Sequence, residues 1–437
     1  MLLTPSINSP KQPFPKLELH HPPRYDGPLI LNPHLTATPL KTQQHIEGSL
    51  LMVFTAQPQS IDLSRAYIFQ PALEDNCNAL GQVKAGSLLK LIDVVGAFST
   101  LQYTHNEHMV VTASLDRTNF VNAIHLWEFI YMESVITQVW KSSMEVKVTV
   151  YAVNFRRGPI TKRLVATAHL IYVGLDEQRN KRQAPPLKLT SVNEYQMAEA
   201  ANIRRKKRFT EQEIAPWIAM DQSDSPYWYS ESREMTPKDA NIQGNVFGGV
   251  ILEIIAKTGR KSAQAHCLGE VVVGARMDRM SFLAPGFIGE TIRSRAIVTK
   301  TWRTSLEVQV EIESINPNQP DKPRLIANCY LVFVRLNNMG LPADVPPWLP
   351  NTPLQEQRAD SAQTRRQIRE QERQEVAEEK QSTPNLGQQI ALSWNDMGER
   401  LAHCWETLTH GHQPLSPLNR FIPFEDALKH QSSLFKN

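Results

Sequence analysis

The sequence predicts an α+β protein in which one domain occurs twice, each copy being a long helix followed by several antiparallel strands. Three observations lead to this prediction: a repeated set of motifs, an apolar stretch with helical spacing in each copy, and strand-like alternation after that stretch. The chain has 437 residues, which is too long for one ordinary hydrophobic core and favours two domains with extensions.

The repeat consists of five blocks in the first half that match five blocks in the second half at an offset near 162 residues. The matching pairs are Asn78–Asp93 with Asn241–Ala256, Leu115–Phe120 with Met277–Phe282, Lys141–Val146 with Arg303–Val308, Arg163–Ala166 with Arg324–Ala327, and Pro185–Leu187 with Pro346–Trp348. Because all five keep nearly the same offset, they indicate an internal duplication.

Each copy opens with an apolar face of helical spacing, which is formed by Leu88, Leu89, Leu91 and Ile92 in the first copy and by Ile251, Leu252, Ile254 and Ile255 in the second. Strands follow, because residues 144–150 and 306–312 alternate between apolar and polar, and residues 170–173 and 331–334 are continuously apolar. A sheet that must cover one central helix curls around it, so we expect a curved antiparallel sheet wrapped around each helix.

The boundaries of the repeat divide the chain into five parts. We expect a Pro-rich and poorly ordered extension over residues 1–55, a first domain over 56–190, a helical basic linker over 191–232, a second domain over 233–350, and a charged, helical tail over 351–437.

Two segments outside the repeat carry patterns of their own. The linker ends in the basic run Arg204–Arg208, which could meet phosphates, serve as a weak nuclear address or simply be solvated. The tail contains a charged helical stretch around Arg365–Glu379. A second possible helix from Leu386 to Trp405 has one apolar face, which we expect to dock on the protein's own core.

Composition excludes several classes of protein. A formal charge of +3 gives no general reason to expect nucleic acid or an anionic membrane as a partner. The 4 cysteines are far apart, with no CxxC pair and no histidines at zinc spacing, so we expect neither disulfides nor a metal site. No stretch approaches the roughly 20 apolar residues of a membrane span, and the N-terminus has no signal core. We therefore expect a cytoplasmic protein without a cofactor.

The repeat of a helix and strands, with its Asn-x-x-Gly-x-x-x-Gly-Gly turn at Asn241–Gly249, resembles the hotdog fold, and its duplication resembles the tandem-hotdog acyl-CoA thioesterases. The resemblance covers about residues 64–350 and is carried also by Ser87–Asp93, Val111–Asp116 and Lys141–Val146. It implies hydrolysis of fatty acyl-CoA, one continuous sheet, antiparallel helices, active sites at the seam between the copies, and a homo-oligomer, often a trimer.

The resemblance also implies how an active site is shared. One copy supplies a carboxylate from its helix, and the other supplies the asparagine turn and a helix N-terminus. The complete set is Asp93 from the first copy, facing Asn241 and either Gly248 or Gly249 from the second. The carboxylate either activates water or attacks the thioester itself, and a helix N-terminus favours the developing oxyanion.

The opposite seam lacks its carboxylate, because Ala256 stands where the first copy has Asp93. It offers Asn78, Ala85 and Gly86, so we expect one working site and one degenerate site in each chain. The alternative is a purely structural role, in which these asparagines form turns and the glycines permit close packing.

Two matching segments are candidates for binding the CoA moiety. Lys141 and Ser142, with their counterparts Arg303 and Thr304, resemble the region of the family near pantetheine and nucleotide, and a structural use is equally open. A hotdog dehydratase is disfavoured, since it uses histidine where this helix has Asp93. A non-catalytic acyl-CoA sensor or scaffold remains the alternative function, because fold alone does not decide between them.

Overall fold

The computed structural model describes the part of the chain between residues 58 and 382. The described ranges are 58–107, 109–155, 161–214, 218–220, 229–241 and 244–382. Every described element belongs to one unit of the chain, which begins at Pro58. The predicted N-terminal extension and the predicted helix from Leu386 to Trp405 lie outside the described residues.

The first copy contains one long helix and a set of antiparallel strands. These elements are β2 (Ala66–Pro71), α1 (Ala85–Tyr103), β3 (Met109–Leu115), β4 (Thr118–Phe120), β5 (Phe129–Val139), β6 (Ser143–Asn154) and β7 (Thr161–Leu175). Short 3-10 helices cover Ile61–Ser64 and Glu74–Asn76. A separate parallel pair joins β1 (Gln59–Ser60) to β8 (Leu187–Lys188).

The second copy repeats the same order of elements. They are β9 (Tyr229–Glu234), a 3-10 helix (Pro237–Asp239), α3 (Gly248–His266), β10 (Val272–Met277), β11 (Met280–Ser281), β12 (Thr291–Thr301), β13 (Ser305–Ile315) and β14 (Arg324–Arg335). Strand β9 begins inside the range predicted as linker. A further helix follows each copy, α2 (Val192–Ile214) after the first and α4 (Pro353–Ser382) after the second.

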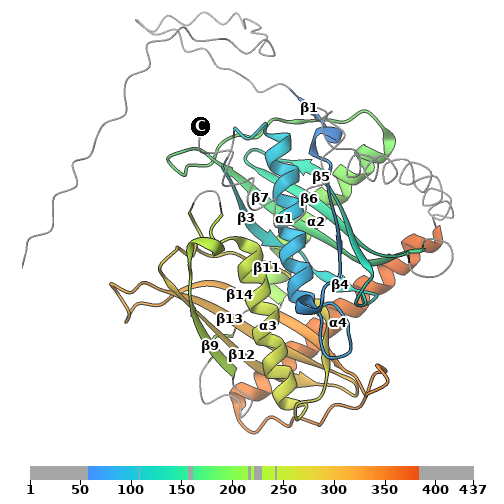
Figure 1. Ribbon diagram of the computed structural model, residues 1–437, viewed down its shortest axis with the longest axis vertical. Coiled ribbons are helices and arrows are strands. Elements are labelled where there is room, and N and C mark those ends of the chain that lie inside the picture. Colours follow the sequence, from blue (N-terminus) through green and yellow to red (C-terminus); the bar gives the residue numbers. More distant parts are fainter. Residues whose placement is uncertain are drawn as a thin grey trace, which may run out of the picture. The chain divides into compact units, whose positions relative to one another are not determined.

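The two copies share one 12-stranded sheet with the order β2-β5-β6-β7-β4-β10-β14-β13-β12-β9, in which β3 and β11 pair beside this path. The copies join where β4 pairs with β10 and β3 pairs with β11. Figure 1 shows α1 and α3 together on one side of the continuous sheet. The predicted α+β class, with an antiparallel sheet around the helix of each copy, is confirmed.

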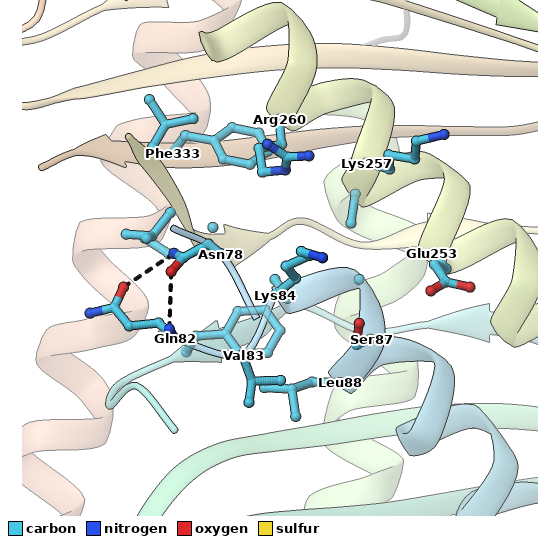
Figure 2. Close-up of a pocket in the computed structure, with 18 of the residues that line it drawn as sticks. Asn78, Gln82, Val83, Lys84, Ser87, Leu88, Glu253, Lys257, Arg260 and Phe333 are labelled. Carbon is cyan, nitrogen blue, oxygen red and sulfur yellow. Dashed lines mark hydrogen bonds between the residues drawn. The ribbon is translucent and has the colours of Figure 1, made fainter. Parts of the chain in front are cut away.

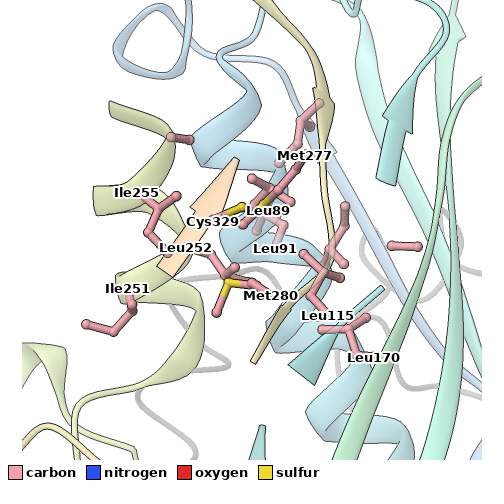
Figure 3. Packing of buried hydrophobic residues seen from close by; sticks show 14 of the residues in the cluster. Leu89, Leu91, Leu115, Leu170, Ile251, Leu252, Ile255, Met277, Met280 and Cys329 are labelled. Carbon is pink, nitrogen blue, oxygen red and sulfur yellow. The ribbon is translucent and has the colours of Figure 1, made fainter. Parts of the chain in front are cut away.

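The hydrophobic core is continuous across both copies. The predicted apolar faces of α1 and α3 are buried against the sheet, and Figure 3 shows Leu89 and Leu252 packing with Met277 and Met280 where the copies meet. Fully burying one such side chain stabilises a fold by about 1.5–3 kcal/mol. The shared core therefore holds the two copies in a fixed relation, which any site built from both requires.

Helix α2 lies on the outer face of the sheet and is anchored by ion pairs. Arg204 contacts the fully buried Glu145 at 2.5 Å, and Arg208 bonds Asp116 at 2.8 and 2.9 Å and also bonds Glu145. Successive residues of a strand point to opposite faces, so Glu145 faces α2 while its neighbours face the core. These two arginines of the basic run are therefore bound to buried carboxylates of the sheet.

Helix α4 repeats this arrangement in the second copy. Arg365 bonds Glu307 at 2.6 Å, and Arg369 bonds both Asp278 and Glu307. Burial alone raises the pKa of Asp278, but Arg369, Arg117 and Arg276 together outweigh it and bring the value to about 2. Arg365, Arg369, Asp278 and Glu307 are all offset by about 161 or 162 from their counterparts, so the duplication includes the helix after each domain.

We predict that Arg369→Ala lowers the free energy of unfolding by about 3–5 kcal/mol, because the buried Asp278 loses its main partner and the buried Glu307 loses one of its two arginines. Denaturant unfolding measures the loss. Arg366→Ala is the matched control on the same helix, since its pair with Glu370 is exposed, and it should cost roughly 1 kcal/mol or less. Equal losses in the two variants would contradict a structural role for the buried network.

Candidate active site at the seam

The helices α1 and α3 pack antiparallel, so the first turn of each faces the middle of the other. Lys90 of α1 contacts Glu253 of α3 at 3.0 Å. A Cβ placed on Gly86 would lie 3.3 Å from Ala256, and one placed on Gly249 would lie 2.9 Å from the Lys90 carbonyl. Two equivalent seams result, one where α3 begins and one where α1 begins.

Asp93 lies in the middle of α1, completely buried at the seam where α3 begins. Thr112 of β3 donates a hydrogen bond from Oγ1 to Asp93 Oδ1 over 2.7 Å. The hydroxyl of Tyr172 on β7 lies 2.8 Å from the Asp93 carbonyl oxygen and 3.1 Å from Oδ1. Only a glycine at position 96 leaves space for that hydroxyl, because a Cβ on Gly96 would lie 2.4 Å from it. The carboxylate is thus held from two strands.

The other carboxylate oxygen, Oδ2, faces the first turn of α3. A Cβ on Gly248 would lie 2.8 Å from Asp93 Oδ2 and 2.9 Å from Thr112 Oγ1. Among the described residues, Oδ2 accepts no hydrogen bond of normal geometry, although the backbone N–H of Gly249 lies close enough to lower the pKa of the carboxyl. Asp93, Gly248 and Gly249 are therefore brought together across the seam.

Burial raises the pKa of Asp93 from its usual value of 3.8 to about 6, and hydrogen bonds from Thr112, Tyr172 and Gly249 limit the rise. A base is most effective when its pKa lies near the working pH. Such a carboxylate is ionised at neutral pH and is basic enough to accept a proton from water.

Asn241 lies in the turn that leads into α3. Its side-chain oxygen accepts a hydrogen bond from the backbone N–H of Asn245 at 3.0 Å. The backbone N–H of Asn241 donates to the backbone carbonyl of Asn245 at 2.7 Å. Asn78 closes the equivalent turn of the first copy by accepting from the N–H groups of Leu80 and Gln82. Both asparagines therefore shape the turn before a helix, whatever else they do.

The second seam is depleted of polar groups at three positions. Ala256 replaces Asp93, Gly274 replaces Thr112 and Phe333 replaces Tyr172, which follows from the offset of the repeat. Thr112 and Tyr172 were not identified as site residues from the sequence. The signal for them was present, because both are polar in the copy that keeps the acid and apolar in the other.

A cavity of about 650 Å³ opens at this second seam. Among its walls are Asn78, Gly86 and Ala256, the residues of the predicted degenerate site, together with Phe333 (Figure 2). None of the Asp93, Gly248 and Gly249 triad lines it. The space at the second seam is lined by residues of both copies.

The four predicted CoA contacts lie in two hairpin turns, Lys141 and Ser142 between β5 and β6, and Arg303 and Thr304 between β12 and β13. Lys141 and Arg303 are exposed, and Arg303 lies 3.8 Å from Asp344. The backbone carbonyl of each of the four residues accepts a hydrogen bond from the backbone N–H of a neighbouring segment. Within the described residues, none of the four forms a hydrogen bond or ion pair with the buried carboxylate.

We predict that Tyr172→Phe moves the acidic limb of the kcat/KM profile for hydrolysis of a reactive ester or thioester to higher pH. Tyr172 lowers the pKa of Asp93, so its loss should raise that pKa above about 6. A base works when ionised, so the rate should fall at a higher pH than in the wild type. Tyr103→Phe is the control, since this buried hydroxyl bonds Pro185 and Pro186 instead. An unmoved limb would remove Tyr172 from the site.

No helix among the described residues is long and apolar enough to cross a membrane. No group of three or more histidine, cysteine, aspartate or glutamate side chains among the same residues is placed to hold a metal ion. Cys77, Cys267 and Cys329 are free thiols.

The comparisons with known proteins agree on one family. The thioesterase superfamily matches residues 243–320. Over 307 residues the chain is 25% identical to the mouse cytosolic acyl coenzyme A thioester hydrolase, covering 67% of this chain and 79% of the relative. It is 26% identical to the mouse acetyl-coenzyme A thioesterase over 63% of this chain and 51% of the relative. It is 32% identical to an uncharacterized acyl-CoA thioester hydrolase of Bacillus subtilis over 26% of this chain and 66% of the relative.

Similar solved structures cover about one copy of the repeat. A hexameric acyl-CoA thioesterase is 26% identical with a TM-score of 0.33, covering 36% of this chain and 97% of that one. A Staphylococcus aureus acyl-CoA hydrolase variant is 30% identical with a TM-score of 0.33, and the match covers 36% of this chain and 95% of that one.

Proposed function

The chain belongs to the thioesterase superfamily as a thioester hydrolase with two hotdog domains in tandem, and from this premise we propose that it hydrolyses fatty acyl-CoA to a fatty acid and CoA at one composite site. The observation that carries the proposal is the buried Asp93 carboxylate, with Oδ2 facing the first turn of α3. The acyl-CoA hydrolase names of the relatives support the substrate class.

In the proposed reaction, a water attacks the thioester carbon and the C–S bond breaks. Asp93 takes a proton from the water and returns one to the leaving sulfur, which gives the free thiol of CoA and the fatty acid. Attack by Asp93 itself, to form a transient anhydride that water then opens, fits the same arrangement. In both routes, the ionised carboxylate is the form that reacts.

The carbonyl oxygen of the thioester becomes negatively charged during attack, and we assign its stabilisation to the start of α3. The N–H groups of the first turn of a helix have no partner inside the helix, and the helix dipole favours negative charge there. The glycines at 248 and 249 let the acyl group approach this backbone closely, because neither carries a Cβ.

The test of the proposal is the release of free thiol from short, medium and long acyl-CoAs by the full-length protein. We expect turnover that is greatest on a fatty acyl chain. CoA binding without turnover on any member of the panel would support the alternative, a non-catalytic acyl-CoA sensor or scaffold. The retention of Asp93 with its two hydrogen-bonding partners favours the enzyme, since a binder has no need of a buried base.

We predict that Asn241→Ala lowers kcat/KM by about 10–100-fold, whereas Asn78→Ala leaves it nearly unchanged. Both variants lose equivalent turn hydrogen bonds, so the two should lose similar stability, about 0.5–2 kcal/mol. Only Asn241 precedes the helix that faces Asp93. Equal activity of the two variants in the thiol-release assay would show that the asparagine serves the turn alone.

Three further assignments belong to the same proposal. We assign binding of the CoA moiety to the two hairpin turns that contain Lys141 and Ser142, and Arg303 and Thr304. Replacement of Lys141 or Arg303 by alanine should therefore raise KM more than it lowers kcat.

The proposed compartment is the cytoplasm, which the cytosolic relatives support and which cell fractionation tests. The chain forms a homo-oligomer, which a monomeric mass in light scattering would contradict.

A further inference from the structure

We propose that the cavity of the second seam is a binding site for a long-chain carboxylate, distinct from the catalytic seam. Its volume of about 650 Å³ lies within the range of ordinary small-molecule sites, and its walls come from both copies. Hydrolysis at Asp93 is not required for this inference, because it depends on the walls of this cavity alone.

The second seam has no acid at the position equivalent to Asp93. At the catalytic seam, the buried Asp93 would repel a second carboxylate, since like charges at short distance oppose each other strongly. At the second seam, the equivalent positions are Ala256, Gly274 and Phe333, which carry no charge and no hydroxyl. This seam therefore tolerates an anion that the other disfavours.

Helix α3 carries positive charge beside the cavity where α1 has uncharged residues. Lys257 and Arg260 line the cavity from α3, whereas the equivalent positions of α1 are Val94 and Ala97. Arg260 lies one helical turn after Ala256, on the same face. Loss of the acid is thus accompanied by the gain of two cations beside its place.

The cations of this wall are not all neutralised by acids. Arg260 donates to the neutral side chain of Gln264 at 3.0 Å, and Lys84 donates to a backbone carbonyl, that of Asp75, at 2.9 Å. Lys257 pairs with Glu231 at 3.0 Å. Figure 2 shows Lys84 before α1, and Arg260 and Lys257 on α3, around the same space.

The acids that line the cavity do not cancel this charge. Glu253 pairs with Lys90 of α1 at 3.0 Å, and Glu231 is the partner of Lys257. Asp75 is exposed at the rim. Arg233, also in the lining, pairs with Asp239 at 2.7 Å. Arg260 and Lys84 remain as cations that can bind an anion through charge-assisted hydrogen bonds.

The remainder of the wall is apolar, which defines the other end of the ligand. Its apolar residues include Leu88, Phe120, Ile254, Val272, Ile292 and Phe333. A cationic group beside an extended apolar surface matches an amphiphile with an anionic head and a hydrocarbon chain. A long-chain carboxylate has this chemistry, and burial of its chain would supply most of the affinity.

The test is calorimetric binding of hexadecanoate, below its micelle concentration, to the full-length protein. We expect one site per chain that is weakened about 10-fold or more by Arg260→Gln, the loss of one charged hydrogen bond. Hexadecanol, which has the same chain without the charge, should bind more weakly and be insensitive to Arg260→Gln. Lys322→Ala, an exposed cation outside the cavity, is the control and should leave binding unchanged.

Two more variants make the outcome decisive. Ala256→Asp restores an acid to the cavity and should weaken hexadecanoate binding while sparing hexadecanol. Asp93→Asn should leave the affinity for hexadecanoate unchanged. If Asp93→Asn bound hexadecanoate more tightly and Arg260→Gln had no effect, the ligand would lie at the catalytic seam and the proposal would be wrong. Displacement of hexadecanoate by CoA would also overturn it. Thiol release is measured separately, so binding without hydrolysis would reject the proposed function and keep this site.

Discussion

Asp93→Asn is expected to lower kcat/KM for the preferred acyl-CoA by about 10³-fold, which lies in the range typical of an essential general acid–base group. Asparagine keeps the shape of the side chain but neither accepts a proton at neutral pH nor attacks a thioester. The measurement is thiol release at pH 7.5, with the fold checked by circular dichroism. The variant should fold, because burial raises the pKa of Asp93 and so makes its charged form unfavourable in the folded state.

The control for this result is Glu253→Gln, which removes the nearest acid on the opposite helix. Glu253 is partly exposed and pairs with Lys90, so its loss should change activity by no more than about 3-fold, as expected for an exposed ion pair. If Asp93→Asn kept more than about a tenth of the wild-type rate, or if Glu253→Gln were the more damaging change, the buried carboxylate would not be the reacting group.

Gly248→Ala is expected to cause the second largest loss, about 100-fold in kcat/KM. The added Cβ would lie 2.8 Å from Asp93 Oδ2 and 2.9 Å from Thr112 Oγ1, so the carboxylate or the start of α3 must move. Displacing a reacting group by about 1 Å is enough for a loss of that size. The measurement is the same thiol-release assay, with Asp93 left intact.

The first copy provides the matched control for this change. Ala85 occupies the position equivalent to Gly248, at the start of α1, so Ala85→Gly makes the reverse exchange at the seam without a base. Its activity should stay close to that of the wild type, although the helix start loses some stability. If Gly248→Ala were fully active as well, the close approach of the backbone to Asp93 would have no part in the reaction.

The sequence predicted the elements that depend on near neighbours along the chain. The apolar residues 88, 89, 91 and 92 recur with helical spacing, and the alternation over residues 144–150 is that of a strand, so both were correctly assigned. The repeat then predicted the arrangement of two copies, since each copy must bury the same face. The single difference between Asp93 and Ala256 was enough to predict which seam keeps an acid.

The partners of that acid could not be predicted in the same way. Thr112 and Tyr172 come from β3 and β7, and only the register of these strands brings their hydroxyls to one carboxylate. The arginines of α2 and α4 looked like a solvated run and a charged tail. The acids that they bind, Asp116 and Glu307 among them, lie far away in the sequence and reach them only because the helices dock on the outer sheet face.

By itself, the sequence determined the α+β class and the duplication, and it singled out Asp93 as the residue that we propose at the centre of the site. The tertiary structure alone decided that both Gly248 and Gly249 border Asp93, that two hydroxyls hold it, and that a cavity remains beside Ala256. The physical reason is the range of the interactions. Periodicity and turn chemistry act between neighbouring residues, whereas burial, pKa and cavity volume depend on which distant segments the packing brings together.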